Sequence, residues 1–189
     1  APVPGLQGAG GAGEAGPVVR RSLTYMALVA AIVVALDRWT KHWASAELAL
    51  RSPWRLVGDY VRLNYARNSG VAFGIGHGTH FPYYVFSIVA IAVILWMFVS
   101  GRVGTGGGRR FALGLLLGGA IGNLVDRVSS GEVVDFIEVG VPQWHWPIFN
   151  VADSAITVGI LLLLVLGWSR GPVAPAAAPG SDGSPGPAG

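Results

Sequence analysis

GGAIGNLVDRVSSGEVVDFIEVGVPQWHWPIFNVADS, residues 118–154, is the stretch that decides the fold. It joins two strongly apolar runs, yet it is rich in amide and carboxylate side chains. A carboxylate close to hydrocarbon is costly, so it indicates a functional site whose partner has to be identified. Two carboxylates that reach one pocket can share a proton and activate water. The polar residues of the stretch are Asn123, Asp126, Arg127, Asp135, Asn150 and Asp153.

The composition predicts an integral membrane protein. Of the 189 residues, 52% are hydrophobic and 12% charged, and the mean hydropathy is +0.54. A soluble domain usually has about 25% charged residues. The absence of cysteine excludes disulfides, thiolate metal sites and a cysteine nucleophile. The net charge of +3 comes without a dense basic cluster, which argues against nucleic-acid binding. No zinc site is expected, because the four histidines lack metal-ligand spacing: His42, His77, His80 and His145.

The two ends differ in composition from the rest of the chain. Residues 1–16 and 171–189 are rich in Gly, Ala and Pro and nearly free of charge, so both are expected to be disordered. The first is not a signal peptide, since no basic segment precedes an apolar core there. We therefore expect a tail over 1–20, a membrane domain over 21–170 and a second tail over 171–189.

Four apolar runs predict four transmembrane helices. They lie at about 23–37, 83–100, 111–128 and 149–168, and each approaches the roughly 20 residues that cross a bilayer. Four crossings place both termini on one side of the membrane. The polar residues then meet at the opposite face, where the active site is expected.

Arginines at the other helix ends assign the termini to the cytoplasm and the site to the outer face. The number of basic residues between the first two apolar runs opposes this orientation, because this segment would lie on the outer side. Aromatic residues accompany these cations, so we expect the charged side chains to snorkel at the membrane–water interface and not to mark the cytoplasmic side. These cations are Lys41, Arg51, Arg55, Arg62 and Arg67.

Two further patterns concern packing. The segment WRLVGDYVRLNYARNSGVAFG, residues 54–74, partly alternates apolar and polar residues, which predicts short strands on the membrane surface followed by a glycine-rich turn. Gly114, Gly118 and Gly122 recur at helical spacing with Gly119 beside them, which predicts the close approach of neighbouring helices.

Several polar residues have two interpretations. Asp37 and Lys41 stand four apart on a helix, so they form either a boundary ion pair or the wall of a site. Asn68 either forms a turn or holds a substrate backbone. Asp126 is either a structural partner of Arg127 or an acid that this cation orients.

The same holds for the remaining candidates. Asp135 is flanked by apolar residues that would raise its pKa towards that of a working acid, or else it is a solvated loop carboxylate. Asn150, Asp153 and Ser154 crowd the start of the last run, where one N-cap suffices. A Ser154 nucleophile would need a base, for which His145 is the remaining candidate.

Five motifs together resemble the bacterial lipoprotein signal peptidase family, the type II signal peptidases. They occur in the family's order and cover the chain from about Leu23 to Trp168. The motifs are LDRWTK at 36–41, NSGVAFG at 68–74, GGAIGNLVDR at 118–127, VVDF at 133–136 and FNVADSAITVG at 149–159. Two features depart from the family: Arg38 stands where Gln is usual, and the Gly/Pro-rich tails lie outside its core.

The resemblance implies an aspartic protease of the bacterial inner membrane. Such an enzyme removes signal peptides from diacylglyceryl-modified prolipoproteins just before the lipidated cysteine, without cofactor or metal, and is blocked by globomycin-type inhibitors. Its partners would be the lipid-modified substrate and membrane lipids, and we expect a monomer. The implied fold has four transmembrane helices with a small extracytoplasmic β-cradle after Trp54 and a short extracytoplasmic helical loop around 132–146.

The motifs also carry over residue roles. Asp135 and Asp153 match the catalytic dyad, of which one ionised carboxylate would take a proton from water while its protonated partner donates to the scissile carbonyl. Asn68, Asn123, Arg127 and Asn150 match substrate-binding positions, and Asp37, Lys41, Gly70 and Asp126 match supporting positions. A small proton-coupled transporter and a membrane-assembly protein with purely structural ion pairs are the alternatives.

Overall fold

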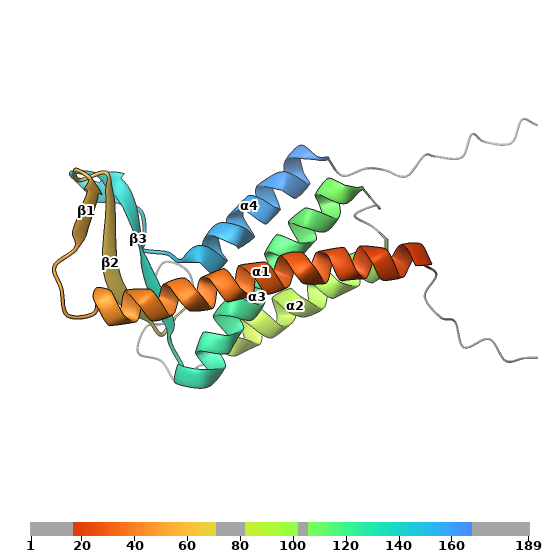
Figure 1. The fold of residues 1–189 in the computed structure, drawn as a ribbon, viewed down its shortest axis with the longest axis horizontal. Helices are drawn as coiled ribbons and strands as arrows, with labels where there is room; N and C mark the ends of the chain where they lie inside the picture. The colour runs from red at the N-terminus through yellow and green to blue at the C-terminus, as the bar shows by residue number, and fades with distance from the viewer. Residues whose placement is uncertain (1–16, 71–81, 102–105, 168–189) are drawn as a thin grey trace, which may run out of the picture.

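The computed structural model describes residues 17–70, 82–101 and 106–167. Within them, helices run roughly along one direction and a small sheet lies at one end of them (Figure 1). The elements in chain order are α1 (Pro17–Glu47), β1 (Trp54–Val57), β2 (Val61–Asn68), α2 (Tyr84–Val99), α3 (Gly107–Ser130), β3 (Val133–Val141), β4 (Trp144–His145) and α4 (Val151–Val165). Because α1 begins at Pro17, the last residues of the predicted tail 1–20 are helical, and proline is favoured at a first helical position.

Two of the helices are long and apolar enough to cross a membrane, namely Arg20–Glu47 within α1 and Gly107–Ser130, which is α3. α2 and α4 are even more apolar, but they have only 16 and 15 residues. At 1.5 Å per residue they extend about 24 and 22 Å, against about 30 Å of hydrocarbon. The helices and the sheet therefore fit a membrane protein, and four crossings stay a prediction.

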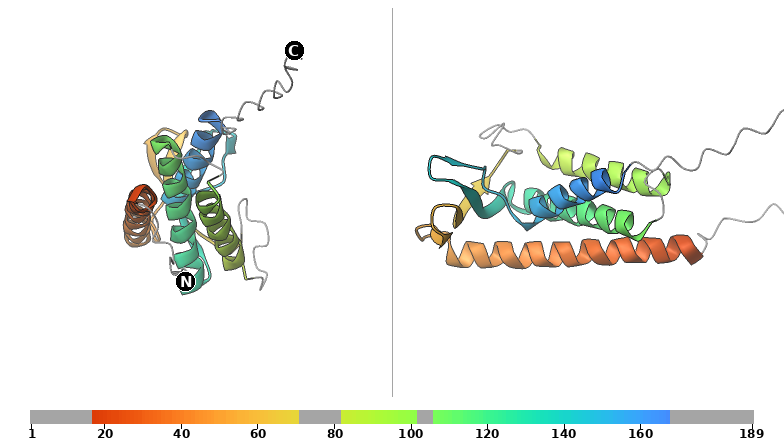
Figure 2. Two further views of the ribbon diagram at one scale, coloured as in Figure 1. Left: turned by 90° about the vertical axis from the view of Figure 1, so that its right-hand side faces the viewer. Right: turned by 90° about the horizontal axis from the view of Figure 1, so that it is seen from above.

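Glycines let α3 occupy the centre of the bundle, with α1, α2 and α4 packed around it (Figure 2). A Cβ added to Gly118 would lie 2.6 Å from the Cβ of Val33, so α1 and α3 meet nearly backbone to backbone. Gly114 and Gly122 face the same helix, whereas Gly119 faces α4. The close approach predicted from their spacing is confirmed.

The sheet has the order β1-β2-β3-β4 with antiparallel neighbours. The hairpin of β1 and β2 confirms the predicted strands after Trp54, and its turn contains Gly58 at φ +50°. The glycine-rich turn predicted next falls largely within residues 71–81, outside the described residues.

The predicted helical loop around 132–146 is wrong, because this region forms β3 and β4. Its sequence VVDFIEVGV is rich in branched residues, which suit a pleated strand, and β3 pairs along β2. Phe136 then packs against Ala44 and Leu48, which anchors the sheet to α1.

The cations that opposed the predicted orientation all have acidic partners at this end of the molecule. These ion pairs do not decide the orientation, because acidic residues contribute little to the positive-inside rule, and the reach of the cations to a membrane interface stays a prediction. The pairs are Lys41 with Asp37, Arg51 with Glu47, Arg55 with Asp59, Arg62 with Glu138 and Arg67 with Glu132.

Candidate active site

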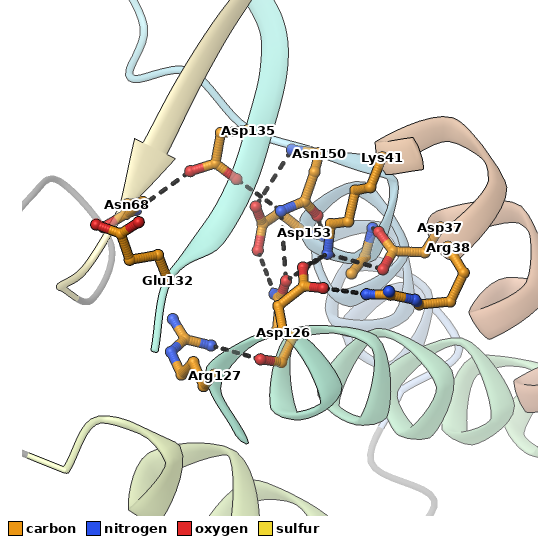
Figure 3. Close-up of polar contacts among 12 residues, drawn as sticks. Asp37, Arg38, Lys41, Asn68, Asp126, Arg127, Glu132, Asp135, Asn150 and Asp153 are labelled. Carbon is orange, nitrogen blue, oxygen red and sulfur yellow. Dashed lines mark hydrogen bonds and ion pairs between the residues drawn. The ribbon is translucent and has the colours of Figure 1, made fainter. Parts of the chain in front are cut away.

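Asp135 lies in β3 with its side chain almost fully buried, 3% exposed. Its Oδ1 accepts a hydrogen bond from Nδ2 of Asn150 at 2.6 Å, and its Oδ2 accepts one from Nδ2 of Asn68 at 3.2 Å (Figure 3). Burial, followed by repulsion from Asp153, raises the pKa of Asp135 to about 6 although both amide hydrogen bonds favour the ionised form. A carboxyl group of this kind can hold a proton and release it near neutral pH.

Asp153 lies in the first turn of α4, where Asn150 is the N-cap. Oδ1 of Asn150 accepts from the backbone N–H of Asp153 at 2.9 Å, and Oδ2 of Asp153 accepts from the backbone N–H of Asn150 at 3.3 Å. Oδ1 of Asp153 accepts from Nδ2 of Asn123 at 2.7 Å. The capping interpretation is therefore correct, but the crowding of polar groups also ties this carboxylate to α3.

A groove of about 1070 Å³ contains both carboxylates. Its polar lining includes Asn68, Asn123 and Arg127, whereas Asn150 is fully buried behind the two acids. Apolar side chains of α2, α3, α4 and the segment before α4 form much of the remaining wall, among them Phe86, Ala90, Ala120, Ile148 and Ile156.

Arg127 has spare hydrogen-bonding capacity in this groove. Its guanidinium donates to Oγ of Ser87 and to the backbone oxygen of Gly70, each at a long 3.4 Å. Its Nε is buried and has no hydrogen-bond partner among the described residues. A buried donor without a partner is costly, so this arginine is suited to receive an acceptor from a ligand.

The structure supports the turn interpretation of Asn68 and adds a contact to Asp135, whereas a contact with a substrate backbone stays a prediction. Its Oδ1 accepts from the backbone N–H of Gly70 at 3.0 Å, which makes the turn, while its Nδ2 holds Asp135. The predicted supporting residue Gly70 is buried and joins this turn to Arg127.

The Asp37–Lys41 pair is buried beside the site, and neither residue lines the groove. Nζ of Lys41 lies 2.7 Å from Oδ2 of Asp37 and 2.7 Å from Oδ2 of Asp126, and the three side chains are nearly inaccessible. Asp126 also pairs with Arg38, the residue that departs from the family pattern. Of the two interpretations of Asp126, the structural pair with Arg127 is not formed among the described residues, because consecutive helical residues point in different directions and Asp126 pairs with Arg38 and Lys41 instead.

The alternative of a serine nucleophile receives no support from the geometry. Oγ of Ser154 donates to the backbone oxygen of Asn150 at 2.9 Å. His145 lies in β4, with Nε2 2.8 Å from a guanidinium nitrogen of Arg62 and 3.1 Å from the carbonyl oxygen of Asp59.

Two contacts were not foreseen from the sequence. Ser87 is buried in the otherwise apolar helix α2 and accepts a hydrogen bond from Arg127. Its isolation among apolar residues is the feature of the sequence from which this contact could have been predicted. The Arg38–Asp126 pair joins α1 to α3 and had no local signal.

Comparisons with known proteins bear on the region that carries this site. The model of the signal peptidase (SPase) II family matches residues 29–168. Similar proteins are the lipoprotein signal peptidases of Syntrophotalea carbinolica, 45% identical over 76% of this chain and 91% of the relative, and of Rhodococcus jostii, 40% identical over 79% and 75%. Two solved structures of a bacterial membrane enzyme align with TM-scores of 0.68 and 0.67 at 29% and 30% identity, covering 76% of this chain and 87% and 92% of theirs.

Proposed function

The chain belongs to the signal peptidase II family of bacterial membrane proteases, and from this premise we propose that it is an aspartic endopeptidase that removes signal peptides from diacylglyceryl-modified prolipoproteins. Cleavage falls just before the lipidated cysteine. The observation that carries the proposal is that Asp135 and Asp153, from a strand and from a helix start, open into one groove. The amide and backbone of Asn150 contact both carboxylates.

The two acids have different roles in this mechanism because their surroundings differ. Asp135 is buried and its pKa is raised to about 6, so it holds the shared proton. Asp153 is less buried and stands in the first turn of α4, where the helix dipole favours a negative charge. Asp153 is then the base and Asp135 the acid.

The proton transfers balance over one turnover. As water attacks the scissile carbonyl, Asp153 takes a proton from it and Asp135 donates its proton to the carbonyl oxygen, which gives a gem-diol. When the carbon–nitrogen bond breaks, Asp153 returns its proton to the leaving nitrogen. Asp135 takes one back from a gem-diol hydroxyl, so the dyad is restored.

The groove suits an apolar substrate with a polar scissile bond. Its apolar walls from α2 and α4 would accept the signal helix and the acyl chains. The free Nε of Arg127 and the remaining amide hydrogen of Asn68 would hold the peptide backbone. Asn123 and Asn150 are committed to the dyad, so we assign them to holding the two acids instead of the substrate.

We also propose four crossings of the inner membrane, with both termini in the cytoplasm and the site near the outer face. The basic residues at the far ends of the helices, Arg20, Arg21, Arg109 and Arg110, support this orientation. The enzyme would act as a monomer among membrane lipids, and globomycin-type inhibitors would occupy the groove. A proton relay is disfavoured, because Asp135 lies on a strand and Asp153 at a helix start instead of near mid-membrane.

A gel-shift assay tests the proposal. Purified protein is mixed with a diacylglyceryl-modified prolipoprotein, and mass spectrometry locates the new terminus. Wild type should cleave just before the lipidated cysteine, with or without a metal chelator, and a globomycin-type inhibitor should block it. Asp135→Asn and Asp153→Asn should be silent, whereas Asp59→Asn, a matched change at an acid in the β1–β2 turn, should cleave. Cleavage by either dyad variant would defeat the aspartic mechanism.

A further inference from the structure

A buried lysine touches the hydrogen-bond network of the dyad. Besides its two carboxylate partners, Lys41 donates from Nζ to Oδ1 of Asn123 at 3.1 Å, and the lysine is 3% exposed. The ammonium thus donates hydrogen bonds to Oδ2 of Asp37 and Oδ1 of Asn123 and forms an ion pair with Asp126. Ion pairing alone would not require the third contact.

The third contact determines which way the amide of Asn123 faces. An ammonium group can only donate hydrogen bonds, so Oδ1 of Asn123 must point at Lys41. The NH₂ group of the same amide then points at Asp153, where Nδ2 donates to Oδ1 at 2.7 Å. Turning the amide by half a rotation would set its oxygen against the carboxylate.

The second amide of the site depends on the same atom. Nδ2 of Asn150 donates to Oδ1 of Asn123 at 3.3 Å as well as to Oδ1 of Asp135. Its own oxygen is held by the N-cap hydrogen bond to α4, so its orientation is fixed independently. The amide of Asn123 therefore connects Lys41 to both acids. Its Oδ1 accepts from Lys41 and from Asn150, which in turn holds Asp135, and its Nδ2 donates to Asp153.

We propose that Lys41 is a positioning residue of the peptidase: by fixing the amide of Asn123, it keeps an N–H donor on Asp153 and so keeps this carboxylate ionised as the base. The inference rests on the proposed function, since it presupposes that the two acids activate water. Lys41 acts through Asn123 and does not line the groove, so it has no direct contact with the substrate there.

The charges around this network determine how the test must be built. Lys41 faces Asp37 and Asp126, of which Asp126 is also paired with Arg38. Loss of Lys41 alone leaves Asp37 as a buried anion without a cation, which would destabilise the fold. The double variant Lys41→Met/Asp37→Asn removes one anion and one cation and leaves the Arg38–Asp126 pair in place.

Arg38→Gln provides the matched control. It removes a cation from the same cluster without touching Asn123, so it reports the structural contribution of the ion pairs. The remaining charges that act on the dyad, Arg127 and the two acids themselves, are unchanged in both variants.

The measurement is the pH profile of prolipoprotein cleavage, with kcat and KM separated at each pH, and single-turnover rates where turnover is slow. In Lys41→Met/Asp37→Asn we expect a fall in kcat of about tenfold or more with KM within about twofold, because the amide of Asn123 loses the ammonium that helps to keep its N–H donor on the base. The acidic limb of the profile should move to higher pH, because a hydrogen-bond donor to a carboxylate favours its ionised form. Arg38→Gln should keep both limbs at their wild-type positions.

Several results would overturn the role of Lys41. One is a pH profile of the double variant whose acidic limb stays at the wild-type position, and another is the same shift of this limb in Arg38→Gln. A third is unfolding of the charge-balanced double variant, which would make Lys41 purely structural. A loss beyond about 10⁴-fold would also contradict the proposal, since both acids remain in place. If wild type itself fails to cleave, the proposed function fails instead, so the two failures are distinguishable.

Discussion

The rate of cleavage should fall steeply above neutral pH, because the acid of the dyad must be protonated. Burial and repulsion from Asp153 raise the pKa of Asp135 to about 6. Above this pH the protonated fraction falls about tenfold per unit, so kcat/KM should drop about 100-fold between pH 7 and pH 9. The two acids interact, and the limb is therefore a property of the pair.

A variant can move this limb in a known direction. Nδ2 of Asn68 donates to Oδ2 of Asp135 at 3.2 Å and favours the ionised form, so the hydrogen bond lowers the pKa of Asp135. In Asn68→Ala this contribution disappears, and the alkaline limb should shift to higher pH even though cleavage at the optimum is slower.

A fluorogenic diacylglyceryl lipopeptide in detergent micelles allows kcat/KM to be followed from pH 5 to pH 9. The thermal unfolding midpoint, measured at each pH, controls for loss of folded protein. A flat profile between pH 7 and pH 9, or an Asn68→Ala limb displaced to lower pH, would refute the assignment of Asp135 as the acid.

Three further changes test the packing, the linkage and the nucleophile. Gly118→Ala should lower the free energy of unfolding by about 1–3 kcal/mol, because its Cβ would lie 2.6 Å from that of Val33, whereas Gly107→Ala, with no atom within 4 Å, should not; thermal unfolding in detergent measures both. Because the pKa of Asp135 rises from 3.8 unfolded to about 6 folded, its ionisation costs stability as pH rises through this window, by up to about 3 kcal/mol. Asp135→Asn should therefore gain stability relative to wild type between pH 4 and pH 7.5, and an unchanged difference in unfolding midpoint would contradict this linkage. Ser154→Ala should keep most of the cleavage rate in the gel-shift assay, since its hydroxyl only bonds the helix backbone, and a silent folded variant would reopen the serine mechanism.

The sequence predicted the apolar helices and the gathering of polar residues at one end of them. It predicted the boundaries of the helices and strands less well. α1 continues to Glu47, well beyond the predicted end of its apolar run near Asp37. The extension is polar in composition, but Ala44 and Leu48 pack under Phe136 of the sheet. This stabilisation comes from residues far along the chain, and local hydropathy contains no information about it.

The strand around Asp135 shows a different kind of failure. The branched residues of VVDFIEVGV favour a strand, whereas the family resemblance predicts a helical loop, and pairing with β2 gives the strand. The ion-pair partners of Asp126 could not be predicted from the sequence. Lys41 lies on another helix, and the contact depends on how closely Gly122 lets α1 approach α3.

The proposed roles of Asp135 as the acid and Asp153 as the base follow from the secondary-structure elements in which the two residues lie. A strand residue that faces inward at the end of a helix bundle loses its water, so Asp135 is the carboxyl that favours a proton. A residue in the first turn of a helix lies close to unpaired backbone N–H groups, and this favours an anion at Asp153. Replacing Asp135 by glutamate and replacing Asp153 by glutamate should therefore affect folding to different extents. The side chain of Asp153→Glu can still reach the backbone N–H of Asn150, as glutamate does in capping boxes, whereas Asp135→Glu would overfill a site that is 3% exposed. Loss of folding is therefore expected mainly in the second.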